Sequence, residues 1–123
     1  MKEQLIEFET AKLAKEKGFE EFSNKVYNQF GKLFIFNSGL LQNHERILAP
    51  TQSLLQKWLR EEKDMNVWLK PHYGEVNGLI TNNWSVYVDD FYGHHLITDY
   101  IYIHGYEEAL EAGLIAALKL IKL

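Results

Sequence analysis

The sequence predicts an α+β fold built on one three-stranded antiparallel sheet, and two kinds of pattern support that prediction. Residues 50–63 and 106–123 place apolar side chains at the spacing of one helix face. Between them, three segments alternate apolar and polar residues with the period of two that is typical of half-buried strands. The connections are short enough for antiparallel neighbours. The expected order over residues 49–123 is therefore α-β-β-β-α, with an N-terminal helix and a hairpin as additions.

Length and composition indicate one domain over residues 1–123 with a core of its own. Of the 123 residues, 46% are hydrophobic and 14% are aromatic, which is enough to fold without disulfides or metal staples. The chain contains no cysteine, which excludes a thiolate metal site and a cysteine nucleophile and fits a reducing compartment. We find neither a signal peptide nor an apolar run of about 20 residues, so we expect a cytoplasmic protein with no membrane partner.

The first 48 residues are expected to form a helix and a less regular extension. A loose apolar spacing predicts a helix over residues 3–17, which Gly18 ends in the left-handed conformation. Phe19 is expected to fold back onto the last turn of that helix. Residues 25–28 and 33–36 can then pair as a hairpin.

The central helix begins at Pro50, which fits a first helical turn because it has no backbone N–H to donate. One side of this helix carries four apolar residues, Leu54, Leu55, Trp58 and Leu59. The strands follow at residues 65–69, 84–88 and 97–103, with turns expected at residues 74–83 and 89–95. Gly105 ends the third strand, and the last helix begins after it.

The alternation of the strands separates an aliphatic face from an aromatic one. The two main helices are expected to cover the aliphatic face, because an apolar sheet face must be buried. The N-terminal helix and hairpin are expected to cover the other face, whose aromatic residues are also candidates for binding a protein partner: Trp68, Tyr87, Tyr100 and Tyr102. Base stacking on this face would need surrounding lysines and arginines, which the sequence does not supply.

The last helix has more apolar surface than one face needs. Ile115 is one of several residues that widen the stripe, and it is a further candidate for contact with a partner. Either the sheet and another helix both pack on this helix, or a second copy of the chain does, as a homodimer. Gly113 costs about 1 kcal/mol relative to alanine inside a helix, so it indicates close approach of another backbone.

Histidines and aspartates around the second turn are candidates for a zinc or manganese site: His94, His95, His104, Asp89 and Asp90. Adjacent histidines on a strand point to opposite faces, so His94 and His95 cannot both bind one ion unless the turn bends. A structural role is therefore favoured over a metal.

Catalytic patterns are missing from the sequence. No serine lies in a nucleophile-elbow context, and no glycine-rich phosphate loop occurs. Glu107, Glu108 and Glu111 are expected to face solvent near the start of the last helix, where its dipole favours negative charge. We therefore expect a protein without catalytic residues, cofactor or small-molecule substrate.

Three segments, residues 8–19, 49–61 and 106–114, resemble a family of short uncharacterised proteins of prophages and mobile elements, often from Bacteroides-type bacteria. The resemblance covers both ends and the middle of the chain. It implies a setting on a mobile element but no activity, cofactor or catalytic residue.

The α-β-β-β-α order also resembles the double-stranded RNA-binding domain, whose last helix begins with basic residues that meet phosphate. Here the corresponding positions are Glu107 and Glu108, and the net charge of the chain is −4 with scattered lysines and arginines. Both features argue against nucleic acid as a partner, because phosphate binding needs a basic face.

The leading hypothesis is a non-catalytic accessory protein of a prophage or mobile element that binds another protein or itself. A nucleic-acid-binding module is the first alternative. A metal-dependent enzyme centred on the histidines and aspartates is the second.

Overall fold

The computed structural model describes residues 4–21, 25–35, 47–76, 79–96 and 103–122. Helices and strands follow one another as α1 (Phe8–Glu16), β1 (Lys25–Tyr27), β2 (Leu33–Ile35), β3 (Ile47–Leu48), α2 (Gln52–Glu62), β4 (Asn66–Val76), β5 (Leu79–Asp89), β6 (Ile103–His104) and α3 (Tyr106–Leu120). The strands form two antiparallel sheets with the orders β2-β1-β3 and β4-β5-β6. The α+β fold is confirmed.

The C-terminal part keeps the predicted order, because α2, β4, β5, β6 and α3 follow in sequence and the three strands are neighbours in one sheet. The predicted hairpin before it is also present, with Val26 opposite Phe34. It belongs to a second sheet that the sequence did not predict, since β3 pairs with β1. Most of the third predicted strand, residues 97–102, lies outside the described residues.

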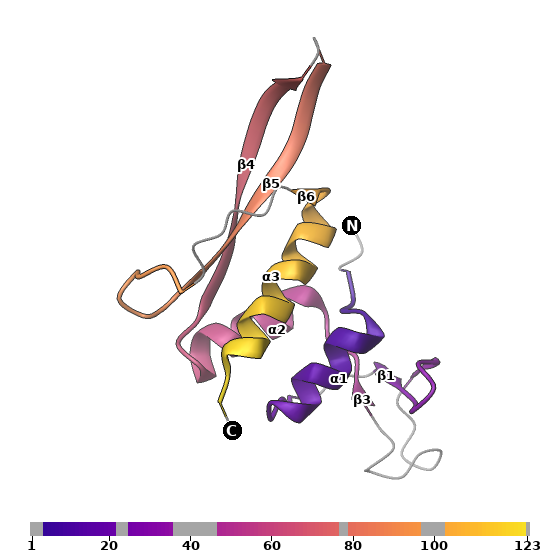
Figure 1. The fold of residues 1–123 in the computed structure, drawn as a ribbon. Helices are drawn as coiled ribbons and strands as arrows, with labels where there is room; N and C mark the ends of the chain where they lie inside the picture. Colours follow the sequence, from indigo (N-terminus) through magenta and orange to yellow (C-terminus); the bar gives the residue numbers. More distant parts are fainter. Residues whose placement is uncertain (1–3, 22–24, 36–46, 77–78, 97–102, 123) are drawn as a thin grey trace.

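The predicted turn at residues 74–83 is wrong, because β4 and β5 continue through it as one long hairpin. The register runs without interruption from Asn66 opposite Asp89 to Val76 opposite Leu79. Only residues 65–69 and 84–88 show clean alternation in the sequence, but the backbone ladder carries the pairing well beyond them. This β-ribbon is the longest feature of the molecule and extends past the helices (Figure 1).

The core forms where α3 lies against the base of the β-ribbon, with α2 packed on both α3 and β4. A Cβ atom at Gly113 would lie 2.5 Å from Cγ1 of Val86 and 2.8 Å from Cγ1 of Val67. Gly113 is therefore closely approached, but the prediction that another backbone approaches it is wrong. Its neighbours are valine side chains of the sheet rather than a second backbone.

The prediction that α1 covers the aromatic face is wrong. α1 packs on α3 and β3 instead, so α3 lies between α1 and the β-ribbon (Figure 1). The wide apolar surface of α3 provides the reason, because it offers contact to the sheet on one side and to α1 on another.

The first helix is shorter than predicted at its start, because the chain before Glu7 is extended along the residues that precede α2. The N–H of Ile6 donates to the carbonyl of Pro50 at 3.0 Å. At its other end, Gly18 has a φ of +98° and Phe19 donates its N–H to the carbonyl of Ala14 at 2.9 Å, as predicted.

The expectation that Glu111 faces solvent is wrong, since its side chain is buried where α1 and α2 begin. Its Oε2 accepts the N–H of Glu7 at 2.9 Å, and its Oε1 accepts Nε2 of Gln52 at 2.9 Å. The same Nε2 donates to the carbonyl of Glu107 at 2.9 Å. The carboxylate lies at the positive end of the α1 dipole, which favours its charge there and joins the three helices.

None of the helices in the described ranges combines the length and the apolar character needed to cross a membrane.

Candidate functional site

The end of β5 leads into a tight turn that its own side chains hold closed. The N–H of Asp90 donates to the carbonyl of His94 at 2.9 Å, and the N–H of Gly93 donates to the carbonyl of Asp90 at 3.1 Å. Oδ1 of Asp90 accepts the N–H groups of Tyr92 and His94, both at 2.9 Å. Gly93 supplies the positive φ of +83° that this turn requires. The result is a defined rather than a loose loop.

The charge on Asp90 is part of this construction. The N–H of His94 is the largest cause that lowers the pKa of Asp90 below its ordinary value, while desolvation opposes the shift. The His94 ring and the N–H of Tyr92 lower the pKa further. Nδ1 of His94 lies 3.1 Å from Oδ2 of Asp90, and the ring is mostly exposed. The turn therefore favours ionised Asp90.

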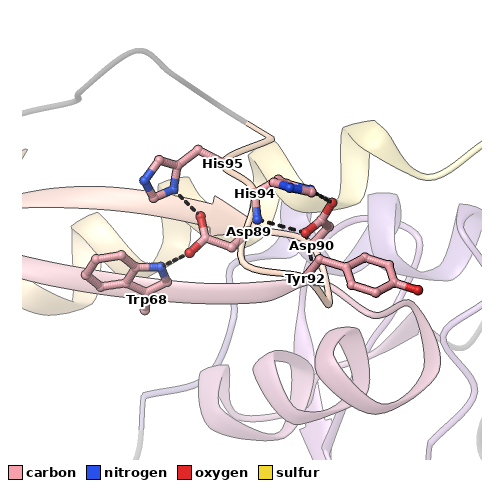
Figure 2. Close-up of polar contacts among 6 residues, drawn as sticks. All are labelled: Trp68, Asp89, Asp90, Tyr92, His94 and His95. Carbon is pink, nitrogen blue, oxygen red and sulfur yellow. Dashed lines mark hydrogen bonds and ion pairs between the residues drawn. The ribbon is translucent and has the colours of Figure 1, made fainter.

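The preceding residue, Asp89, fixes a second pair (Figure 2). Its Oδ1 lies 2.5 Å from Nδ1 of His95, and its Oδ2 accepts Nε1 of Trp68 at 2.6 Å. Trp68 in turn stacks on Tyr87, with ring centroids 4.2 Å apart and planes 14° from parallel. Asp89 therefore joins β4 to the chain that leaves the turn.

The two aspartate–histidine pairs are separate, and their histidine rings lie on different sides of the turn (Figure 2). Within the described ranges, no group of three or more histidine, cysteine, aspartate or glutamate residues is placed to hold a metal ion. The fifth candidate, His104, lies in β6, and its side chain is outside what the structure describes. The metal hypothesis thus has two pairs of ligands that do not converge.

A serine–histidine–aspartate arrangement is not formed by the described residues either. Ser85 is buried, and its Oγ has no hydrogen-bond partner. Four residues of extended strand, about 13 Å, separate it from Asp89. Ser85 is therefore not placed for activation by the half-exposed His95.

The predicted partner-binding residues are placed as follows. Tyr87 is buried and Trp68 is half-buried, and their rings stack on each other. Ile115 is half-buried and lies in a groove between α1 and α3 that also includes Leu13. The excess apolar surface of α3 around Ile115 is therefore partly covered by α1. Tyr100 and Tyr102 lie outside the described residues.

A pair of highly exposed aromatic residues was not predicted. Phe91 and Tyr92, in the middle of the turn, are 76% and 80% exposed. Their rings contact each other edge to face at a centroid distance of 5.4 Å. We call residues 90–94 the aromatic turn. The sequence contained a signal for it, since two adjacent aromatic residues in a predicted turn have no strand face to be buried on.

A groove of about 580 Å³ lies beside the aromatic turn. Its apolar lining includes Met65, Leu96, Leu120 and Ile121, and its charged lining includes Lys63, Asp64 and Lys122. Leu96 and Leu120 are more than 40% exposed. The groove and the aromatic turn together form a continuous, partly apolar surface near the end of α3.

Comparison with protein-family models, with curated proteins and with solved structures found no match for this chain.

Proposed function

We propose that this chain is a non-catalytic accessory protein that binds another protein through the aromatic turn and the groove beside it. The observation that carries the proposal is the exposure of Phe91 and Tyr92, at 76% and 80%, on a turn closed by hydrogen bonds. The setting on a prophage or mobile element is supported by the resemblance of its three sequence segments.

Exposed aromatic side chains on a rigid support are what protein interfaces favour. Tyrosine, tryptophan and phenylalanine are enriched in interface centres, and a few such residues provide most of the binding energy. The turn already fixes the backbone of Phe91 and Tyr92, so binding would order only their side chains. Little conformational entropy would then be lost on association.

The groove supplies the second part of an interface. Its volume of about 580 Å³ and its leucine and isoleucine lining suit one or two apolar side chains of a partner. Lys63 and Lys122 lie at the same groove and can bind carboxylates at the rim of an interface.

The alternatives have less support. The start of α3 carries Glu107 and Glu108, both exposed, where phosphate would have to bind. For a metal-dependent enzyme, the described residues contain no group of three or more potential metal ligands at His95.

The proposal is tested by site-specific cross-linking in the cells that naturally produce the protein. A photoreactive amino acid replaces Tyr92 in one variant and Lys57, which is exposed on α2, in the control. We expect one discrete cross-linked protein from position 92 and none from position 57. Adding Phe91→Ala should remove the product from position 92.

Equal products from both positions, or products that survive Phe91→Ala, would contradict the proposal. The circular dichroism of each variant should match that of the wild type, because all of the substituted side chains are exposed.

A further inference from the structure

The outer edge of the β-ribbon is formed by β4, which pairs with β5 and with no other strand in the part of the chain that the structure describes. A sheet edge presents backbone N–H and C=O groups that another extended strand can pair with. Which residues present these groups can be read from the hydrogen bonds at the base of the ribbon.

Two hydrogen bonds show which way the backbone faces. The carbonyl of Val88 accepts from the N–H of Leu96 at 2.7 Å, so Val88 faces away from β4. The carbonyl of Val67, its partner in the ladder, accepts Nε2 of Gln56 at 2.6 Å, so Val67 faces away from β5. The register is continuous, so every second residue of β4 after Val67 also faces the outer edge. Pro71, Tyr73 and Glu75 are among them.

The base of this edge is closed to a further strand. Gln56 occupies the carbonyl of Val67, and Pro71 has no N–H to donate. Proline at this position leaves the β4–β5 ladder intact, because its nitrogen faces outward. Such features protect natural sheet edges from unwanted pairing.

The distal part of the edge is different. β6 pairs only with Asn83 and Trp84, so the ribbon beyond them has two strands in the described structure. Two-stranded ribbons are marginally stable alone, and three or more strands are needed for independent stability. The outward backbone groups of Tyr73 and Glu75 are thus placed to pair with an additional strand.

We propose that a second copy of this chain supplies that strand, with β4 pairing antiparallel to β4 of its partner around a two-fold axis at Gly74. An antiparallel edge is complementary to itself, so each outward N–H meets an outward carbonyl without a different sequence. In this register Tyr73 lies opposite Glu75 of the partner subunit, giving about four backbone hydrogen bonds. The result is a four-stranded sheet in place of two two-stranded arms.

The neighbouring registers are less favourable. An axis at Tyr73 would place Pro71, which has no N–H, opposite Glu75 of the partner subunit. An axis at Glu75 would place two carboxylates directly opposite each other, which is destabilising. Gly74 at the axis also allows close contact, because opposite residues that are not hydrogen-bonded approach to about 4.5 Å between Cα atoms.

A disulfide test follows from this geometry, because the chain has no cysteine. Gly74→Cys would place two thiols across the axis within the Cα separation that a disulfide needs. Under mild oxidation we expect Gly74→Cys to form a linked dimer at least roughly tenfold faster than Lys57→Cys, since association raises the local thiol concentration.

Two further variants separate backbone pairing from chance contact. Glu75→Pro in the Gly74→Cys chain removes an outward N–H as Pro71 does, and should reduce the rate to that of Lys57→Cys. Glu75→Ala keeps the N–H and should leave the rate high. Thermal unfolding of the reduced variants checks that each is folded.

Equal rates for Gly74→Cys and Lys57→Cys, or an unchanged rate with Glu75→Pro in a folded chain, would overturn the proposal. Gly74 is opposite Thr81, and the extended strand from Thr81 to Asp89 places the aromatic turn about 26 Å away. The disulfide rate and the cross-link from position 92 therefore test separate claims.

Discussion

The β-ribbon packs on α3 at its base, and its two ends differ from that region in the contacts that they make. At the base, α3 approaches so closely that Gly113 has no room for a Cβ atom beside Val67 and Val86. At one end, Phe91 and Tyr92 are exposed on their turn. At the other, the ribbon has two strands and an open edge. The residues that stabilise the chain are thus separate from those proposed to bind.

The polar contacts of Asp89, near the base of the β-ribbon, are among those that stabilise the chain. Asp89 accepts from Trp68 and pairs with His95, so its two carboxylate oxygens both have partners within the molecule. The neighbouring Asp90 instead holds the turn that presents the aromatic residues. Asp89 thus joins neighbouring segments at the base, whereas Asp90 closes the turn that carries Phe91 and Tyr92.

The largest expected effect is that of Gly113→Leu. The added side chain would overlap the Cγ1 atoms of Val67 and Val86, so we expect a loss of more than about 3 kcal/mol in the free energy of unfolding. Chemical denaturation would measure it. Gly113→Ala is the graded control, and it should lose about 1 kcal/mol although alanine favours the helix. Wild-type stability of Gly113→Leu would show that α3 does not pack on the sheet as described.

A somewhat smaller loss is expected from Glu111→Leu. It would leave the N–H of Glu7 and the amide of Gln52 without their buried acceptor, at a cost of about 2–4 kcal/mol. Glu111→Gln retains one acceptor oxygen and should lose less. The two variants would be compared by urea denaturation at neutral pH. If leucine were tolerated better than glutamine, the carboxylate would not join the helices.

A local effect is expected from acid at Asp90. Hydrogen bonds from His94 and Tyr92 lower the pKa of Asp90, so the turn gains stability above the ordinary aspartate pKa and loses it as pH falls through the lowered value. Amide resonances of Tyr92 and His94, followed by NMR during an acid titration, should shift with a midpoint below that of an ordinary aspartate. A midpoint at or above the ordinary value would mean that the carboxylate does not hold the turn.

The smallest effect on stability is expected from the residues proposed to bind. Phe91→Ala and Tyr92→Ala remove exposed side chains, so the free energy of unfolding should change by less than about 0.5 kcal/mol. Thermal and chemical denaturation would measure the change. A loss as large as that of Gly113→Ala would place these rings in the stabilising part of the molecule.

Hydrophobic periodicity was sufficient to predict the helices around the sheet. The stripe after Pro50 corresponds to α2, and the apolar stretch at the end corresponds to α3. The close approach at Gly113 could be predicted as well, because glycine inside a helix is costly without a packing reason.

The long ribbon was not predicted, because its distal part lacks alternation and β4 contains Pro71 and Gly74. In the sequence, the dipeptide Asn77-Gly78 is a strong signal for a two-residue hairpin connection. The position of Pro71 could not be judged either, since its acceptability depends on which edge its nitrogen faces.

Glu111 is buried and Phe91 is exposed, which is the reverse of what their residue types predict. Glutamate near a helix start usually faces solvent, and only the arrival of Glu7 and Gln52 from distant parts of the chain gives it partners. The sequence predicted binding residues on strand faces and, at Ile115, on the last helix, whereas the exposed rings belong to a turn.

The separation of stability from binding is tested most directly by measuring both quantities in Gly113→Ala and Phe91→Ala. Each variant would be unfolded by denaturant and cross-linked from position 92 under conditions where it is folded. We predict that Gly113→Ala loses about 1 kcal/mol and keeps its cross-link, while Phe91→Ala keeps its stability and loses the cross-link. The reverse pattern, or parallel loss of both in either variant, would contradict the account.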